Sequence, residues 1–408
     1  MEPSRFISVL FISPMQLPPQ FSQFVSDHRK DDVVKLRLKY HGKEPWMDDA
    51  VTHIQSLQKA GKKFIDPATG EDFTPALMLM PLSVEQATAV GIARHHQRMV
   101  REGDTILDMT CGLGIDSMMF ARVPGVTLTT CELNPVAARA ARFNFSSMEN
   151  VTVIEGDSVE YLRNHDGRFD LIFIDPARRD SGGGRVYNIR QCTPDITAIL
   201  PLMMSKSDRI LIKLSPMIDI TQTLRDLGVE CRILTVDDRH ECKEILVDID
   251  CPRDTPSSVT VINGNKEFGF TPEEEQKATA TYATPDDLHP GAWLYEPSPA
   301  AMRAAPFHLL SEKFGLKKLH QNTHLYIGHD NHAADLFPGN ARKIIDVIEL
   351  SSSNIKQLAK RYPTLNLAVR NYPSTPEELL KKARIRQGGE LKAFAVTTTS
   401  GRLLIVCE

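Results

Sequence analysis

Short apolar runs alternate with amphipathic stretches through the middle of the chain. Strand-like runs stand at 105–109, 126–131, 151–154, 169–174 and 208–214, and stretches of helical period follow them at 115–122, 135–148, 158–164, 194–204 and 218–227. This alternation predicts a parallel sheet with helices on both faces. Two further strands, 230–236 and 243–249, are separated by a short polar loop with no room for a helix. We therefore expect an α/β fold whose seven-stranded sheet ends in an antiparallel hairpin.

The first part of the chain has a different pattern. Helical spacing at 31–40 and 48–60 predicts an N-terminal helical region over residues 1–80. Nothing in this region indicates chemistry, so we expect a helical cap, with a lid or substrate contact as the alternative. A capping-box pattern at Ser83–Gln86 then predicts a helix that runs to about Met99.

The α/β pattern fills residues 81–252 and is followed by a linker. Cys251–Ser258 is rich in proline and serine, which is typical of a connection between domains. Beyond it, helical and strand patterns mix, and we expect two α+β domains at 257–340 and 341–408.

Composition and charge limit the class of protein without selecting one. The 408 residues are enough for several domains, and 41% hydrophobic with 25% charged residues is typical of a globular protein. The net charge of −4 gives no overall case for binding nucleic acid or membrane. No apolar run approaches the roughly 18–20 residues needed to span a bilayer, so we expect no membrane association.

Cysteines and histidines show no metal-binding pattern. The seven cysteines include no Cys-x-x-Cys pair, which favours reduced thiols and a cytoplasmic protein. Four histidines (His320, His324, His329 and His332) lie close in sequence, but their spacing matches no ligand pattern. We expect them to be ordinary loop residues and expect no metal.

The first strand of the α/β pattern runs into an acid and a glycine turn. The segment reads Ile106-Leu107-Asp108-Met109-Thr110-Cys111-Gly112-Leu113-Gly114-Ile115-Asp116. Glycine is needed where backbone turns tightly and approaches a ligand closely, and the helix that follows offers unpaired N–H groups at its start. Further acids follow later apolar runs in order: Glu132, Asp157 and Asp175.

This ordered series resembles the class I S-adenosylmethionine (SAM) methyltransferases. The resemblance implies that Asp108, Met109, Thr110, Cys111, Gly112 and Gly114 hold the methionine end of SAM, that Glu132 holds the ribose, and that Asp157 with Ser158 holds the adenine. Leu133, next to Glu132, is a further candidate for contact with the cofactor. Glu132 stands 20 residues past Gly112, a spacing that fits a ribose acid. A dinucleotide-binding Rossmann domain also has such an acid, but it would have glycine where Ser117 stands and would continue with parallel units. A nucleotide-free α/β domain with fortuitous acids remains the plainer alternative.

The fourth strand leads into Asp175-Pro176-Ala177-Arg178. Ligands bind beyond the carboxyl ends of parallel strands, and the tetrapeptide resembles the Asp/Asn-Pro-Pro-aromatic motif of amino-methylating enzymes. In that motif the acid and a proline carbonyl orient an exocyclic amine toward the methyl carbon. Asp175, Pro176 and Ala177 are therefore the candidate catalytic residues. Ala177 replaces the second proline and Arg178 the aromatic, although a guanidinium can also stack on a base. A strand-end turn with solvated arginines is the alternative.

The segment after this motif is basic and rich in glycine. We expect Arg178, Arg179, Arg185, Tyr187 and Arg190 to line a loop that closes on a phosphate-bearing substrate. A solvated loop would have the same composition. Lys213, at the end of the fifth strand, fits either a phosphate contact or a simple strand-end lysine.

The C-terminal part is strongly positive. Residues 351–402 contain ten Lys/Arg and three Asp/Glu, a net of +7, so the rest of the chain carries −11. This asymmetry favours a module that faces nucleic acid, and Lys381, Lys382 and Arg384 crowd one predicted helix and its end. A solvated helix face is the alternative.

As a whole, the chain resembles a bacterial family of methyltransferases with a ferredoxin-like domain at 257–340 and a C-terminal THUMP-like domain at 341–408. The residues that carry this resemblance outside the α/β domain are Tyr295-Glu296-Pro297-Ser298-Pro299 and Arg370-Asn371-Tyr372-Pro373 with the basic helix that follows. The resemblance implies a Rossmann-like SAM methyltransferase that acts on RNA, either tRNA or rRNA, because THUMP domains of related enzymes bind RNA.

Three functions stay open from the sequence. The first is SAM-dependent methylation of a nucleobase amine in RNA. The second is methylation of a small molecule or a protein, with the basic tail serving only for packing. The third is a SAM-binding, RNA-binding protein without turnover.

Overall fold

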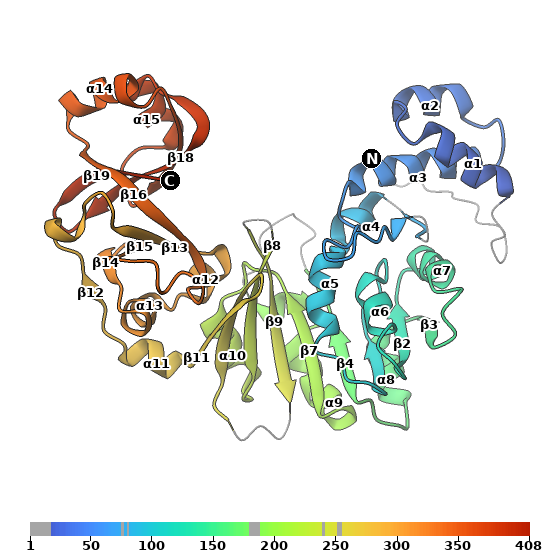
Figure 1. Ribbon diagram of the computed structural model, residues 1–408. Helices are drawn as coiled ribbons and strands as arrows, with labels where there is room; N and C mark the ends of the chain where they lie inside the picture. Colours follow the sequence, from blue (N-terminus) through green and yellow to red (C-terminus); the bar gives the residue numbers. More distant parts are fainter. Residues whose placement is uncertain (1–17, 75–76, 80, 179–187, 239–240, 251–254) are drawn as a thin grey trace, which may run out of the picture. The chain divides into compact units, whose positions relative to one another are not determined.

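The chain forms two compact units. The computed structural model describes residues 18–408 except 75–76, 80, 179–187, 239–240 and 251–254. The first unit comprises Met1–Pro176 with Ala198–Leu211, and the second Ala177–Thr197 with Ile212–Glu408. Figure 1 colours the elements from the N-terminus to the C-terminus.

A parallel sheet organises the first unit. Its strands are paired in the order β4-β1-β2-β3, and all three pairings are parallel. The strands are β1 (Thr105–Asp108), β2 (Thr127–Glu132), β3 (Val151–Glu155) and β4 (Leu171–Ile174). The helices between and after them are α6 (Ile115–Phe120), α7 (Pro135–Asn144), α8 (Ser158–Asn164) and α9 (Ile196–Lys206). Asp108 and Glu132 are the last residues of β1 and β2, and Asp175 directly follows β4. Because these strands are parallel, the three acids lie at the same end of the sheet.

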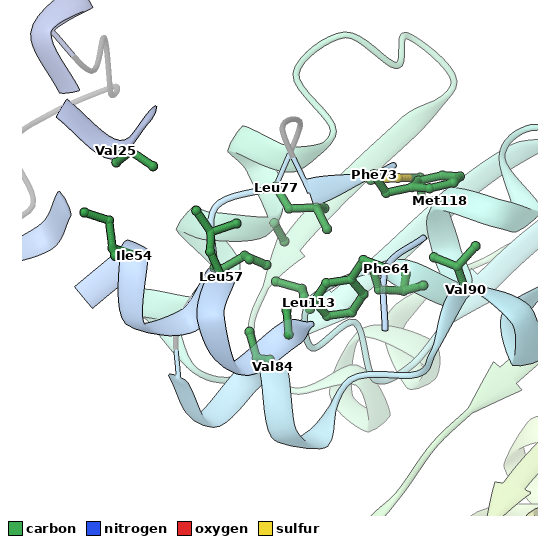
Figure 2. Packing of buried hydrophobic residues seen from close by; sticks show 14 of the residues in the cluster. Val25, Ile54, Leu57, Phe64, Phe73, Leu77, Val84, Val90, Leu113 and Met118 are labelled. Atoms are coloured by element: carbon green, nitrogen blue, oxygen red, sulfur yellow. The ribbon is translucent and has the colours of Figure 1, made fainter. Parts of the chain in front are cut away.

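The N-terminal helices share a hydrophobic core with this α/β region. They are α1 (Pro19–His28), α2 (Val33–Tyr40) and α3 (Met47–Ala60). Phe64, Phe73 and Leu77, from the segment after α3, are buried in one cluster with Leu113 and Met118 of the glycine turn and α6 (Figure 2). The N-terminal region and the α/β domain therefore have one common core, whereas a separate cap would have its own.

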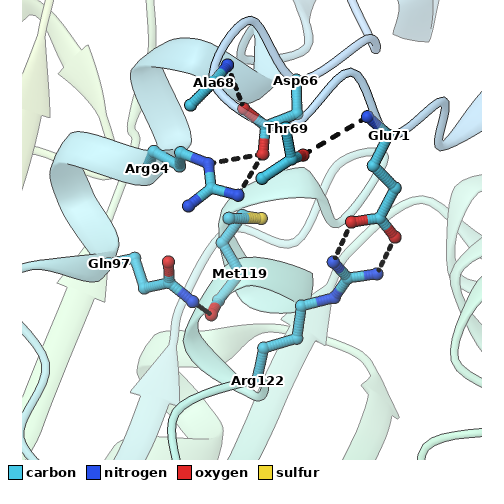
Figure 3. Close-up of polar contacts among 8 residues, drawn as sticks. All are labelled: Asp66, Ala68, Thr69, Glu71, Arg94, Gln97, Met119 and Arg122. Atoms are coloured by element: carbon cyan, nitrogen blue, oxygen red, sulfur yellow. Dashed lines mark hydrogen bonds and ion pairs between the residues drawn. The ribbon is translucent and has the colours of Figure 1, made fainter.

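Ion pairs reinforce this packing. Glu71 accepts two hydrogen bonds from Arg122, at 2.9 and 2.8 Å, and Arg94 of α5 (Val90–Gln97) pairs with the buried Asp66 (Figure 3). Burial is the largest single influence and opposes ionisation of Asp66, but the hydrogen bonds from Arg94, Ala68 and Thr69 with the charge of Arg94 together outweigh it and lower the pKa of the carboxyl. The segment between α3 and α4 is thus fastened to the helices beside the sheet.

The prediction of one continuous helix from Ser83 to Met99 is wrong. The segment forms two short helices, α4 (Pro81–Gln86) and α5. Thr88, between them, donates its hydroxyl to Asp116, and the Val90 amide donates to the carbonyl of Lys63 at 3.1 Å. Tertiary hydrogen bonds of this kind replace the helical ones, and the local pattern cannot predict them.

The second unit contains the expected antiparallel end of the α/β domain. Its first elements are β5 (Ala177–Arg178), β6 (Cys192–Thr193), α10 (Ile220–Leu227), β8 (Arg232–Asp238), β9 (Glu241–Asp250), β10 (Ser258–Asn263) and β11 (Lys266–Phe270), while β7 (Arg209–Leu214) begins in the first unit. β8 and β9 pair antiparallel, as predicted. All seven strands expected from the sequence form.

β10 corrects the expected start of the next domain. The sequence predicts that a new domain begins at residue 257 after the linker, yet β10 pairs in parallel with β8, with Val259 opposite Ile233. β11 continues this sheet as its antiparallel edge. The composition of a linker predicts an irregular connection, but it does not reveal whether the next strand returns to the same sheet.

A second sheet of eight strands forms the C-terminal half of this unit. Its order is β12-β14-β15-β13-β16-β19-β18-β17. The strands are β12 (Thr281–Tyr282), β13 (Trp293–Pro297), β14 (Lys317–His320), β15 (Thr323–Gly328), β16 (Gly339–Glu349), β17 (Thr364–Arg370), β18 (Arg386–Thr398) and β19 (Gly401–Cys407). The helices are α11 (Pro272–Lys277), α12 (Pro299–Ala304), α13 (Phe307–Phe314), α14 (Ser352–Arg361) and α15 (Pro376–Ala383). His320 and His324 stand in strands, not in the loop that the sequence indicated.

β16 joins the two halves of this sheet. Its first residues pair with β13, and Val347 pairs with Ile405 of β19. The two α+β domains expected at 257–340 and 341–408 therefore share one continuous sheet.

Candidate cofactor and substrate site

Asp108 lies beneath the glycine turn. Its side chain is 1% exposed and accepts hydrogen bonds from the Thr110 amide at 2.8 Å, the Ser117 hydroxyl at 2.5 Å and the Thr130 hydroxyl at 3.2 Å. Burial raises the pKa of this carboxyl to about 7. Through these bonds Asp108 links the glycine turn to β2 and α6. Its carboxylate oxygens are therefore engaged by donors of the protein itself.

The turn itself is built on two glycines in left-handed backbone. Gly112 has φ 56° and Gly114 has φ 84°. The turn is closed by the Gly114 amide, which donates to the carbonyl of Cys111 at 2.8 Å. A Cβ on Gly112 would meet nothing within 4 Å, whereas one on Gly114 would lie 2.5 Å from Cζ of Phe145. Gly112 thus offers an open approach to the backbone, and Gly114 is required by packing.

The two glycines should respond differently to alanine. Each substitution places a Cβ in left-handed backbone, at a cost of about 1–2 kcal/mol, and Gly114→Ala also forces Phe145 to move. We expect Gly114→Ala to lower the free energy of unfolding by clearly more than Gly112→Ala does. Urea denaturation of the two variants measures this, and equal losses would contradict the packing role of Gly114.

Glu132 ends β2 and reaches back to the turn. Its Oε2 accepts the Gly112 amide at 2.9 Å, and its Oε1 accepts the Asn134 amide at 2.8 Å. A carboxylate has about four lone-pair positions, so these two bonds fix its orientation and leave acceptor capacity on both oxygens. The next residue, Leu133, is 71% exposed.

Asp157 ends the turn after β3. It is exposed and caps α8, because its Oδ1 accepts the Val159 amide at 2.7 Å. Gly156 before it donates its amide to the carbonyl of Glu132 at 3.0 Å. The chain segments after β2 and β3 are therefore adjacent, and Ser158 is buried behind Asp157.

Asp175 lies at the end of β4 and is joined to the glycine turn through Thr110. The Asp175 amide donates to the Thr110 hydroxyl at 2.6 Å, and the Met109 amide donates to the carbonyl of Phe173 at 2.9 Å. The backbone of β4 is thus fixed against the segment that follows β1. Pro176 is buried.

The sequence did not indicate a buried polar cluster next to the turn. Asp116, on the first turn of α6, receives hydrogen bonds from Thr88 and from Nδ1 of the fully buried His96 at 2.7 Å. Asp116 stands within the glycine motif, but a polar residue at a helix start is usually solvated, so its burial carries no sequence signal.

Asn144 of α7 was missed for a similar reason. Its side chain donates to the carbonyl of Leu113 at 3.2 Å and accepts the Met78 amide at 2.6 Å. It therefore links the glycine turn to the N-terminal segment. An asparagine near a helix end carries no such signal.

The proposed substrate residues of the second unit fall into two groups. Ala177 and Arg178 pair with β6 through their backbones, whereas Arg179, Arg185 and Tyr187 lie outside the described residues. Arg190 pairs with Asp226 of α10, through Nη2 at 3.2 Å. Burial would raise the pKa of Asp226, but hydrogen bonds from Gln222 and Arg190 outweigh it and lower that pKa. Arg190 thus holds α10 and is not an isolated cation. Lys213 is half-buried in β7.

The basic side chains of the C-terminal part are mostly exposed. Two are engaged internally, because Arg361 pairs with Asp346 and Arg370 with Glu296. Lys381 and Lys382 are exposed in the last turn of α15, and Arg384 follows in left-handed backbone. α14 and α15 lie side by side (Figure 1), so the exposed lysines of both helices belong to one region.

The described part of the chain contains neither a membrane-spanning helix nor a metal-binding cluster. Across its helices, none is both long enough and apolar enough to cross a membrane. Across its His, Cys, Asp and Glu residues, no group of three is arranged to hold a metal ion.

Comparison with known proteins identifies the C-terminal domains. Residues 293–338 match the model of a ferredoxin-like domain family, and residues 339–408 match that of a THUMP-like domain family. The crystal structure of a proposed methyltransferase from Porphyromonas gingivalis is 28% identical, covers 95% of this chain and 97% of its own, and superposes with a TM-score of 0.81.

Curated relatives match about a third of the chain. A protein from Mycoplasma mobile named an uncharacterised RNA methyltransferase is 33% identical over 37% of this chain and 42% of its own length. A ribosomal protein L11 methyltransferase from Caldanaerobacter subterraneus is 23% identical over 34% of this chain and 47% of its own. The chain thus spans less than half the length of each of these two relatives.

Proposed function

We propose that this chain, a methyltransferase-fold protein with ferredoxin-like and THUMP-like domains, transfers a methyl group from SAM to a nucleobase amine in tRNA or rRNA. The observation that carries the proposal is the contact between the turn and the second strand, where Glu132 binds the Gly112 amide. This contact places an oriented carboxylate beside backbone that is open to a ligand. Glycine turns and strand-end acids of this kind hold adenosine-containing ligands.

The residues at the turn fit SAM. Glu132 has acceptor capacity for the two ribose hydroxyls, the exposed Leu133 offers an apolar surface to adenine, and Asp157 is exposed at the next strand end. The backbone at 109–114 would receive the methionine end, with Asp108 supporting it from below. Bound SAM would supply an electrophilic methyl carbon on a sulfonium.

Asp175 is the residue that we assign to orienting the acceptor. Its backbone is fixed by Thr110, so its carboxylate starts from a defined position at the strand end. A hydrogen bond from a substrate amine to this carboxylate, and another to the carbonyl of Pro176, would direct the nitrogen lone pair. Alignment is the main requirement, because the amine loses its proton readily once the nitrogen is cationic.

A protein substrate is the second candidate, because one curated relative is named a ribosomal protein methyltransferase. Incubating the full chain with labelled SAM, total cellular RNA and ribosomal protein separates the two. Label that nuclease removes supports RNA methylation, and label that only protease removes supports protein methylation. SAM binding without any transfer would favour a binding protein without turnover.

The basic end of α15 should contribute to RNA binding. Deletion of 351–408 would remove β17–β19 and expose residues packed against these strands, such as Ile344, so substitution is the cleaner test. Glutamine at Lys381 and Lys382 removes charge without placing acids at a helix C-terminus, where they destabilise. We expect weaker binding of bulk tRNA and a salt slope that is shallower by about 1–2 units.

A pair of lysines on another surface provides the control. Lys277 and Lys313 are exposed but pair with Glu273 and Glu274. Replacing both with glutamine gives the same net charge as the Lys381/Lys382 variant. Unchanged RNA affinity in the Lys381/Lys382 variant, or an equal loss in the control, would favour packing as the role of this region.

A further inference from the structure

The outward face of α2 has a composition that folding does not explain. Leu36 is buried beneath the helix, and Arg37 reaches Thr52 and Gln55 of α3 at 3.5 Å. The opposite face presents residues at helical spacing i, i+1, i+4 and i+5, namely Val34, Lys35, Leu38 and Lys39. Val34 is 68% and Leu38 82% exposed.

The sequence around α2 is strongly positive. From Arg29 to Lys43 the chain has six Lys/Arg and only two acids. Both acids are used locally, because Asp31 binds Nδ1 of His28 at 2.7 Å and Asp32 caps α2 through the Lys35 amide at 2.9 Å. In the described part of the chain, neither Lys35 nor Lys39 forms an ion pair with a carboxylate.

An aromatic ring positions two of the cations. The Nζ atoms of Lys39 and Lys43 lie 5.0 and 5.3 Å from the centre of the Tyr40 ring, which itself packs edge-on against Phe24 at 4.9 Å. Cation–π contacts of this kind restrict the long lysine side chains. A polyanion that binds these lysines therefore loses less side-chain entropy on binding.

We propose that the outward face of α2 binds the substrate RNA, with Lys35 and Lys39 on backbone phosphates and Val34 and Leu38 against ribose or an unpaired base. The inference rests on the proposed RNA methylation and adds a contact in the unit that holds the glycine turn. Unpaired lysines release counterions when they bind phosphates. A helix bound to a membrane surface needs a wider apolar face, usually with aromatic residues, and this face has two aliphatic side chains.

The test uses the full chain and bulk tRNA as the probe. Lys35→Gln with Lys39→Gln keeps a good helix former at both positions. We expect affinity to fall at least about threefold and the magnitude of the salt slope to fall by about 1.4, for two phosphates at roughly 0.7 each. Leu38→Ser should weaken binding and leave the salt slope unchanged. The Lys277/Lys313 glutamine pair, which removes the same charge, should bind like the unsubstituted chain.

The outcomes separate this inference from the proposed function. If the unsubstituted chain neither binds RNA nor methylates it, the proposed function fails. If it binds and methylates RNA while the Lys35/Lys39 variant keeps both its affinity and its salt slope, only the role of α2 is overturned. The role of α2 is equally overturned if the control pair loses as much affinity, or if the variant changes binding to anionic lipid vesicles and leaves RNA binding unchanged.

Discussion

Alanine at Asp175 should lower single-turnover methyl transfer by roughly a hundredfold and leave SAM affinity nearly intact. A displacement of about 1 Å in the reacting atoms can cost this much, and Asp175 is the acid that ends β4, with its amide fixed by Thr110 at 2.6 Å. Asn at the same position should retain more activity than Ala, because its amide oxygen still accepts a hydrogen bond. Rapid-quench rates with labelled SAM give the comparison.

Asp170, which directly precedes β4, provides the control for Asp175, which directly follows it. Asp170 is exposed, and its carboxylate accepts the Thr105 amide at 2.8 Å. Asp170→Ala is the same substitution as Asp175→Ala and should change the transfer rate only a few-fold relative to the unsubstituted chain. Equal losses in the Asn and Ala variants of Asp175 would reject the orienting role and favour a structural one.

Alanine at Glu132 should weaken SAM binding by at least tenfold. The variant would lose the two charge-assisted hydrogen bonds that we propose Glu132 makes to the ribose, each worth roughly 1.5–3 kcal/mol, and it also frees the Gly112 amide that Glu132 holds at 2.9 Å. Titration calorimetry measures the change. The transfer rate at saturating SAM should fall much less than the affinity, which distinguishes this variant from Asp175→Ala.

Glu155 gives the matched control on the neighbouring strand. It pairs in register with Glu132, but its carboxylate contacts Arg142 of α7 at 2.9 Å. Glu155→Ala should therefore keep SAM affinity. An unchanged affinity in Glu132→Ala would remove the main support for the cofactor assignment.

The parts of the fold that follow from local pattern were predicted well. β2 was expected at 126–131 and forms at Thr127–Glu132, because its alternation with helices and its flanking turns are encoded within a few residues. The break between α4 and α5 was not predicted, since it depends on Asp116 and Lys63, which are distant in sequence from Thr88 and Val90. The return of β10 to the sheet of β8 is of the same kind.

The candidate site shows the same division. The order of Asp108, Glu132 and Asp175 along the chain is enough to place them at the carboxyl ends of β1, β2 and β4. The order does not predict which side chains the site residues bind. The ion pair between Arg190 and Asp226 is an example, because the two residues are distant in sequence. From the sequence, a basic residue in a glycine-rich segment is a candidate for binding phosphate. Only the structure shows that Arg190 already pairs with a carboxylate.

The shared core of the N-terminal helices determines where the chain can be cut. A fragment that begins at residue 81, the edge drawn from sequence, would lack Phe64, Phe73 and Leu77 and would expose Leu113 and Met118 to water. The turn proposed to hold SAM would then lose the packing on one of its sides. Folding of α3 with the segment that holds Phe64 and Phe73 and occupancy of that turn are therefore linked equilibria, so a ligand that binds the turn should also protect α3 from proteolysis.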